Sequence, residues 1–332
     1  MSDRLVFSMT DATQVGVARR AGSALGRQLG FDEEEAGKIA LVVSELGTNL
    51  VKHAREGELL LSVARDGAAR GVGVLALDRG PGIANLAEAL RDGYSTAGSP
   101  GTGLGAIRRL SATFDVYSAA SGTAMVSFLW SGGPPRRPGV DVEGVSVPKP
   151  GEDVCGDAWA FVHEARRSLV LVTDGIGHGP DAAAAAAEAC RVFAAAAPGS
   201  TALEVLARLH DALRPTRGAA AAIAELDPER RTVRFTGVGN IAGTILTDGG
   251  TRSMVSQHGV LGHSVRKFQD FQYPWPPGAT IVLHSDGLAT RWTFDGYPGL
   301  VRRAPLLAAG VLYRDFRRGN DDTTVVVVRE AA

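Results

Sequence analysis

The sequence predicts an α+β protein made of two domains. Its 332 residues are enough for two hydrophobic cores, and 45% of them are hydrophobic. The segment 131–140 reads SGGPPRRPGV, in which glycines and prolines disfavour both helix and strand. We therefore predict a first domain over residues 1–131, a linker over 132–140 and a second domain over 141–332.

The first domain shows the pattern of a two-layer α/β sandwich. A helix is predicted over residues 11–30, since this stretch begins with polar residues and ends at a glycine. Residues 32–54 form a second helix, which opens on acids that suit the positive helix end. Two further helices are expected between the third and fourth strands. Apolar strand-like runs occupy 4–9, 57–66, 71–80, 113–119 and 123–130.

The second domain reads as a β-sandwich flanked by helices. Two helices are predicted, at about residues 180–197 and 201–213. Apolar runs typical of strands occupy 168–175, 219–227, 232–240, 242–248, 279–287 and 323–328.

Composition excludes several classes of protein. The formal net charge of -1 argues against a general nucleic-acid binder. Two cysteines are too few for a disulfide framework, and the first residues hold no apolar core of signal-peptide length, so we expect a cytoplasmic protein. The most apolar long stretch, 181–198, is mostly alanine and carries Glu188 and Arg191, which indicates a soluble helix and no membrane span.

The helix at 32–54 presents polar groups on one face. Glu45, Asn49 and Lys52 follow one another at helical spacing, away from an apolar stripe. A carboxylate and an amide can therefore act together there. A solvated helix face would show the same pattern.

Two glycine-rich loops follow in the first domain. Asp78 ends a predicted strand and precedes Gly80 and Gly82, so the backbone can approach a ligand closely, and a carboxylate there can accept the exocyclic amine of adenine. The run 98–110, GSPGTGLGAIRRL, places three glycines before a helix, which suits a phosphate. These glycines are Gly101, Gly103 and Gly105.

These three elements, in this order, resemble the GHKL ATPase superfamily over about residues 5–130, whose ATP-binding domain has the Bergerat fold. The segments SELGTNLVKHA, DGYSTAG and RRLSATFDVYS are most similar to small serine kinases of the RsbT and RsbW types, which include anti-sigma factors. The resemblance implies that Asn49 holds Mg2+, Glu45 is the general base and Asp78 binds adenine. It further implies that Gly80, Gly82, Gly101, Gly103 and Gly105 frame the ATP, with Thr123 at the adenine end.

A sensor histidine kinase shares this fold but needs a phosphoacceptor histidine on an upstream helix. The only histidine before His163 is His53. We therefore expect a kinase that acts on Ser or Thr of a partner, through positioning and charge neutralisation.

The second domain places aspartates at strand ends. Asp174 and Asp286 each end an apolar run before glycine, while Asp157 and Asp321 lie in CGD and NDDTT. A single Asp-Gly is commonly a hairpin turn, and Asn-Asp-Asp is ordinary turn chemistry. Several such acids together predict carboxylates gathered at one end of a sandwich, which favours Mg2+ or Mn2+ over zinc.

That set resembles the metal-dependent type-2C protein phosphatases, with an α-β-β-α fold, over about residues 143–330. The forms DGIGHG and NDDTT are similar to the SpoIIE and RsbX branch. The resemblance implies that Asp157, Asp174, Asp286 and Asp321, with the Gly175 carbonyl, bind two Mg2+ or Mn2+ ions. Asp174 would bridge the ions, and a shared water would attack a phosphoserine or phosphothreonine. Asp322 is expected outside this set, and His284 is expected to be a core residue.

The two resemblances together imply a bifunctional regulator of partner switching. The expected substrate is a STAS-domain antagonist of an anti-sigma factor, or a related stressosome-type protein, in a stress or sigma-factor pathway. A homodimer is compatible with the kinase resemblance. Two alternatives remain: a first domain that only binds ATP or a partner as a docking and sensing module, and an interaction protein with a degenerate phosphatase.

Overall fold

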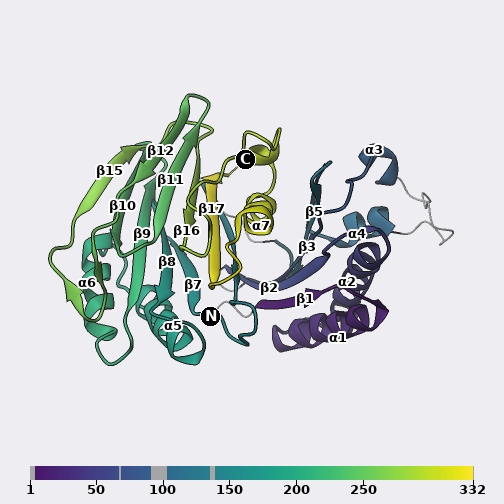
Figure 1. Cartoon of the computed structure of the whole chain (residues 1–332), viewed down its shortest axis with the longest axis horizontal. Coiled ribbons are helices and arrows are strands. Elements are labelled where there is room, and N and C mark those ends of the chain that lie inside the picture. Colours follow the sequence, from purple (N-terminus) through teal and green to yellow (C-terminus); the bar gives the residue numbers. More distant parts are fainter. Residues whose placement is uncertain (1–3, 67–68, 91–102, 135–138, 332) are drawn as a thin grey trace. The chain divides into compact units, whose positions relative to one another are not determined.

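The computed structural model describes residues 4–66, 69–90, 103–134 and 139–331. The chain forms two compact units (Figure 1). The N-terminal unit consists of Asp3–Arg136 together with Phe294–Arg314. The C-terminal unit consists of Arg137–Thr293 and Asp315–Ala332, with Met1–Ser2. The segment Phe294–Arg314 thus packs with the N-terminal unit, although it falls within the range predicted for the second domain.

The N-terminal unit contains one antiparallel five-stranded sheet in the order β1-β2-β3-β5-β4. Asp11 caps helix α1 (Ala12–Gln28), and a capping box of Asp32 and Glu35 starts α2 (Glu33–His53), as the acids at these positions predict. The remaining helices before the last two strands are α3 (Leu86–Ala89) and α4 (Gly103–Leu110). The strands are β1 (Arg4–Ser8), β2 (Glu58–Asp66), β3 (Ala69–Leu77), β4 (Thr113–Ala119) and β5 (Gly122–Ser131).

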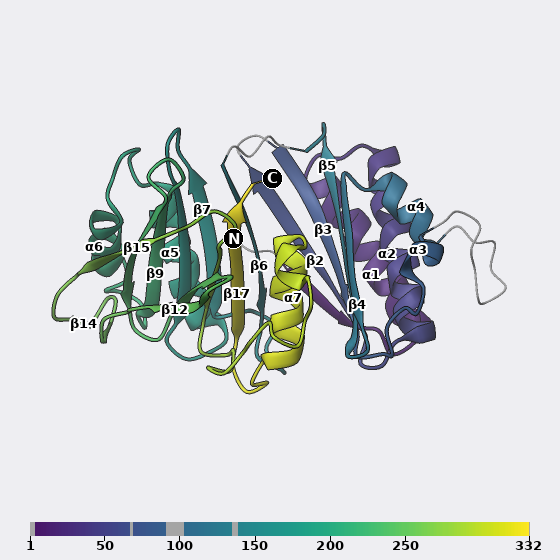
Figure 2. The ribbon, with the colours of Figure 1, turned by 90° about the horizontal axis from the view of Figure 1, so that it is seen from above.

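The sheet of the N-terminal unit is covered on both faces. Val72 and Val74 of β3 join the core formed with α1 and α2. Leu75 and Leu77 point to the other face, where helix α7 (Pro305–Phe316) lies (Figure 2). A Cβ at Gly310 of α7 would lie 2.8 Å from Leu75 and 3.1 Å from Leu77, so glycine permits this close packing. Helix α7 was not among the predicted helices, because its sequence is apolar almost all round and shows no amphipathic period.

The C-terminal unit is a sandwich of two five-stranded sheets. Their orders are β15-β10-β9-β8-β7 and β12-β11-β16-β17-β6. The first sheet contains β7 (Asp157–His163), β8 (Ser168–Gly175), β9 (Ala219–Asp227), β10 (Thr232–Val238) and β15 (Asp270–Pro274). The second contains β6 (Val140–Val147), β11 (Ala242–Thr247), β12 (Gly250–Met254), β16 (Thr280–His284) and β17 (Thr323–Glu330). A small hairpin joins β13 (Gly259–Val260) to β14 (Ser264–Val265).

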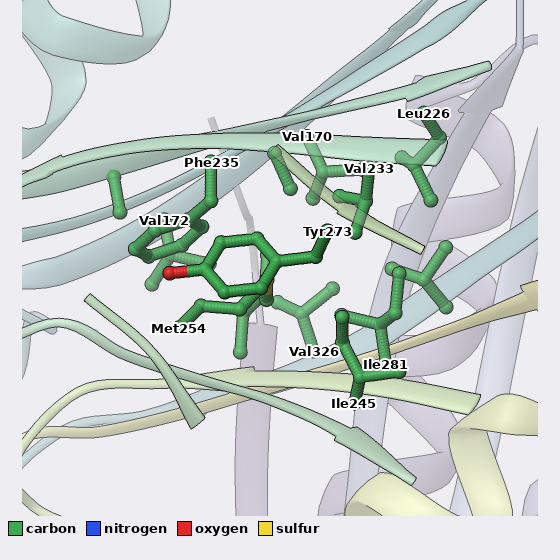
Figure 3. Close-up of a cluster of buried hydrophobic side chains, with 14 of the residues drawn as sticks. Val170, Val172, Leu226, Val233, Phe235, Ile245, Met254, Tyr273, Ile281 and Val326 are labelled. Carbon is green, nitrogen blue, oxygen red and sulfur yellow. The ribbon is translucent and has the colours of Figure 1, made fainter. Parts of the chain in front are cut away.

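The inward faces of the two sheets form one core, shown in Figure 3. Val170 and Phe235 from the first sheet pack with Ile281 and Val326 from the second. Tyr273 lies within this cluster, and its hydroxyl accepts a hydrogen bond from the Val255 amide at 3.0 Å. Alternating apolar residues on each strand build this layer, which fixes the two sheets face to face.

Helices α5 (Pro180–Ala194) and α6 (Ala202–Ala212) cover the outer face of the first sheet. Both were predicted, and the alanines of α5 allow close packing on the strands. Strands β6, β7 and β12 to β15 had not been predicted; β13 and β14 have only two residues each, and β12 is mostly polar. No helix within the described ranges is both long and apolar enough to cross a membrane.

Candidate active sites

Strand ends in the C-terminal unit position the predicted aspartates. Strand β7 begins at Asp157 and β8 closes with Asp174 and Gly175, and Asp157 and Asp174 are directly paired across these antiparallel strands. In the other sheet, Asp286 follows β16 and Asp321 precedes its antiparallel neighbour β17. Each pair therefore lies at one end of its own sheet.

Hydrogen bonds join the aspartates of the two sheets. Ser285 Oγ donates to Asp157 Oδ2 at 2.6 Å. Asn240 Nδ2 donates to Asp286 Oδ2 at 2.8 Å and reaches Asp174 Oδ2 at 3.4 Å. Asn240 was not predicted as a site residue, although its place in GVGN, directly after strand β10, is the same signal that located the aspartates.

Burial and like charges perturb these carboxyls. Burial is the largest cause at Asp174, and the charges of Asp286 and Asp321 add to it, so the pKa of Asp174 rises from 3.8 to about 7. Burial, followed by the charge of Asp174, raises the pKa of Asp157 well above its usual range. Asp157 and Asp174 are therefore buried carboxyls with raised pKa values and like charges nearby, a property common at functional sites.

The donor set fits a hard divalent cation. Asp157 Oδ1 is buried and has no hydrogen-bond partner among the residues that the structure describes, so it is available as a ligand atom. Mg2+ and Mn2+ prefer oxygen donors of this kind. In the described part of the chain, no three His, Cys, Asp or Glu side chains already converge around one point.

Two further residues support this end of the sandwich. A Cβ at Gly175 would overlap the Ala182 carbonyl of α5, so only glycine fits beside Asp174. Asp322 Oδ1 accepts a hydrogen bond from the Lys149 amide at 2.9 Å, and burial raises its pKa. Its charge also contributes to the raised pKa of both Asp157 and Asp174, so it lies near the cluster.

The histidines near the cluster have partners of their own. His284 is buried; its Nε2 accepts a hydrogen bond from Trp292 Nε1 at 3.0 Å, and burial lowers its pKa. It is thus the core histidine that the sequence indicated. His178 Nδ1 lies 2.5 Å from Glu152 Oε1 at the surface.

Stability of the metal-free chain should fall as pH rises. Asp174 has a pKa of about 7 when folded and an ordinary value of 3.8, so the folded chain binds more protons between these limits. The free energy of unfolding then decreases as pH rises through this window, and the raised pKa of Asp157 acts in the same direction. We expect a higher thermal midpoint at pH 5 than at pH 8 in the presence of EDTA, measured by circular dichroism. A midpoint that is higher at pH 8 would contradict the assignment.

In the N-terminal unit, α2 carries Glu45 and Asn49 one turn apart, and both are partly buried. Helix α4 begins beside them, since a Cβ at Gly103 would lie 3.9 Å from Glu45 Oε2. Gly105 is buried within α4. Gly101 and most of the preceding glycine-rich loop lie outside the described residues. The start of α4 thus lies beside the Glu45 carboxylate, which the resemblance implies is the general base.

The other predicted nucleotide contacts meet at the end of β3. Asp78 is buried, and its Oδ1 accepts hydrogen bonds from the amides of Gly80 at 2.6 Å and Thr123 at 3.2 Å. The Asp78 amide donates to the Thr123 carbonyl at 2.9 Å. Burial raises the pKa of Asp78, while these hydrogen bonds and Arg314 oppose the rise. We call this group of Asp78, Gly80 and Thr123 the Asp78 corner.

A conformation that favours glycine shapes the loop after this corner. Gly82 has a φ of 78°, and a Cβ there would overlap the Ala119 carbonyl. The next amide, of Ile83, donates to Ser118 Oγ at 2.7 Å, and Ser118 Oγ lies 3.2 Å from Thr123 Oγ1. Ser118 was not predicted, because a serine within a strand carries no signal of its own.

A buried arginine from α7 adjoins the Asp78 corner. Arg314 is only 3% exposed. Its Nη1 donates to the Asp78 carbonyl at 2.7 Å and reaches the Thr123 carbonyl at 3.4 Å. The Arg79 guanidinium in turn donates to the Arg314 carbonyl. Arg314 follows Asp78 by 236 residues, so no local pattern could have joined them.

Comparison with known proteins gives a separate match for each half of the chain. Residues 164–330 match the family described as Stage II sporulation protein E (SpoIIE). The chain belongs to the SpoIIE family. In this SpoIIE-family chain, residues 8–130 match the histidine kinase-like ATPase domain.

The SpoIIE-family chain is similar to two proteins of Bacillus subtilis (strain 168). It is 30% identical to the serine/threonine-protein kinase RsbT over 131 residues, which are 39% of this chain and 98% of RsbT. It is 24% identical to the phosphoserine phosphatase RsbX over 144 residues, which are 42% of this chain and 70% of RsbX. The crystal structure of RsbX in complex with magnesium matches with a TM-score of 0.51 and 20% identity, over 59% of this chain and 98% of that one, and so shares the fold.

The predicted fusion is thus confirmed. This SpoIIE-family chain joins an RsbT-like, histidine kinase-like ATPase domain to a domain of the type-2C phosphatase class. It is a regulator of the partner-switching type. The predicted α+β fold, with a sandwich of two sheets in the second half, is confirmed as well.

Proposed function

We propose that the chain is a bifunctional partner-switching regulator. It phosphorylates Ser or Thr of a STAS-domain protein in a stress or sigma-factor pathway and also removes that phosphate. The observation that carries the proposal is the pair of separate sites. One is a cluster of aspartates in which the pKa of Asp174 rises to about 7, and the other is the Asp78 corner together with Glu45 and Asn49 on α2 of the same unit.

The phosphatase site would hold two Mg2+ or Mn2+ ions on Asp157, Asp174, Asp286, Asp321 and the Gly175 carbonyl. Bound ions would supply Lewis-acid polarisation of the phosphoryl oxygens and a water of lowered pKa. Asn240 orients the Asp174 and Asp286 carboxylates, and Ser285 orients Asp157. The similarity to RsbX, which is known in complex with magnesium, supports this reading.

The kinase site would hold ATP with one Mg2+. Asp78 accepts the exocyclic amine of adenine, and Thr123 fixes the Asp78 carboxylate through its amide. Gly80 and Gly82 let the backbone approach the base, and the helix start at Gly103 and Gly105 faces the phosphates. Asn49 would hold the Mg2+, and Glu45 would take the proton of the attacking hydroxyl. The similarity to RsbT supports these assignments.

The experiment mixes the full chain with Mg2+, ATP and candidate STAS-domain proteins, and follows phosphate on phosphate-affinity gels. Asp286→Ala should let phosphorylated partner accumulate, because removal is blocked while transfer continues. Glu45→Gln should bind ATP but transfer at least about a hundredfold more slowly, as expected when a general base is lost.

Asp211→Asn is a suitable control, because Asp211 is exposed on α6 and pairs only locally with Arg214 at 3.1 Å. If the unmutated chain removes phosphate but never adds it to any STAS-domain partner, the N-terminal unit is a docking or sensing module. If Asp286→Ala still removes phosphate at the normal rate, the metal-site assignment is wrong.

A further inference from the structure

The segment Phe294–Arg314 connects two candidate metal ligands yet belongs to the N-terminal unit. It leaves the C-terminal unit after Asp286 and returns before Asp321. The chain that enters the segment pairs with the chain that leaves it. The Ala289 amide donates to the Phe316 carbonyl at 2.9 Å, and the Arg318 amide donates to the Gly287 carbonyl at 2.8 Å. We call these antiparallel stretches, residues 287–289 and 316–318, the neck. The neck begins at the residue that directly follows Asp286. A displacement of the segment is therefore transmitted to both aspartate loops.

Contacts hold the second half of the segment within the N-terminal unit. In the middle of the segment, Arg303 Nη1 donates to Asp115 Oδ1 at 3.1 Å and the Ala304 amide donates to Asp115 Oδ2 at 2.8 Å. Further along, Gly310 packs on Leu75 and Leu77 of β3. At its end, Arg314 donates to the Asp78 and Thr123 carbonyls. The segment is thus an integral part of this unit.

The Arg314 contact is specific to the Asp78 corner. A buried guanidinium is costly unless its donors find acceptors, and the backbone of the corner supplies them. Gly122 has a φ of 133°, and a Cβ there would overlap the Asp78 carbonyl and lie 2.7 Å from Arg314 Nη1. Only glycine leaves room for the arginine to reach both carbonyls. Arg314 thus adds a buried donor to the backbone of the Asp78 corner.

We propose that Arg314 is a positioning residue of the nucleotide site, and that α7 couples occupancy of this site to the aspartate loops of the phosphatase site. The inference rests on the proposed ATP binding at Asp78. Nucleotide contact at Asp78 restrains Arg314, and the chain runs from Arg314 through the paired neck to Asp321. Because both sites restrain the same short segment, a ligand at one site changes the affinity of the other.

The first test measures binding of the non-hydrolysable analogue AMP-PNP with Mg2+ to the full chain by calorimetry. Arg314→Met keeps the apolar stem and removes the donors, and should weaken binding by about tenfold or more. Arg303→Met is the matched control, since it removes an arginine of the same segment at a half-exposed pair with Asp115. Its affinity for AMP-PNP should equal that of the unmutated chain.

The second test needs no variant, so it decides the matter even if Arg314→Met does not fold. Hydrogen exchange of the unmutated chain should slow by about threefold or more at amides 306–318 on addition of AMP-PNP. Unchanged exchange there, or equal AMP-PNP affinity of a folded Arg314→Met, would overturn the inference and leave ATP binding intact. If the unmutated chain binds no AMP-PNP, both the proposed nucleotide binding and this inference are wrong.

Discussion

Asp174→Asn should abolish phosphatase activity and stabilise the metal-free chain. Asp174 is paired with Asp157 across β7 and β8 and is bridged to Asp286 by Asn240. Loss of its charge removes one of the carboxylates that would hold the metal ions. Metal assistance is worth several kcal/mol, and about 1.4 kcal/mol is a factor of ten, so hydrolysis of a phosphoserine peptide should fall by at least about a hundredfold.

The same substitution removes a charge that burial, and after it the charges of Asp286 and Asp321, disfavour so strongly that the pKa of Asp174 rises to about 7. In EDTA at pH 8, the free energy of unfolding should increase by about 1–4 kcal/mol, measured by urea denaturation, because about 1.4 kcal/mol corresponds to one pKa unit. Asp211→Asn, on the exposed face of α6, should change neither quantity. A variant that retains activity, or that is less stable than the unmutated chain in EDTA, would contradict the shared metal site.

Asp78→Asn should remove nucleotide binding and spare the phosphatase. The Asp78 carboxylate is buried and already held by the Gly80 and Thr123 amides through Oδ1. An amide at this position replaces an acceptor with a donor, which opposes the amine of adenine. Affinity for ATP, measured by calorimetry, should fall by about a hundredfold, as expected when a charged hydrogen bond becomes a buried mismatch.

Glu34→Gln provides the matched control for this test. Glu34 is an exposed acid of α2 that pairs with Lys38 at 2.8 Å, and its loss should leave ATP affinity unchanged. Hydrolysis of a phosphoserine peptide by Asp78→Asn should remain at the normal level without nucleotide. Normal ATP binding by this variant would show that Asp78 does not recognise the base.

Much of each site was predictable because its residues follow strong local patterns. Asp174 and Asp286 end apolar strands before glycine, and Glu45 and Asn49 lie one turn apart on a long amphipathic helix. Asn240 also follows a strand end, but it was not among the predicted site residues. Ser285 and Ser118 act through hydrogen bonds to residues distant in sequence, and a serine alone indicates no partner.

Helix α7 shows the limit of reasoning from periodicity. A helix that is apolar on most of its surface has no polar face to mark its period, and it resembles a buried strand in sequence. Its membership of the N-terminal unit depends on Gly310 fitting against Leu75 and Leu77. Such a fit depends on the shape of two surfaces that are far apart along the chain.

The sequence by itself determined the two domains, the order of most strands and helices, and the aspartates and glycines at their ends, because strand and helix periods and turn residues are local properties. Tertiary structure alone decided that Phe294–Arg314 completes the N-terminal unit, that Arg314 reaches the Asp78 corner, and that Asn240 bridges Asp174 and Asp286. These contacts arise from packing and burial, whose energies depend on residues that meet only after the chain has folded.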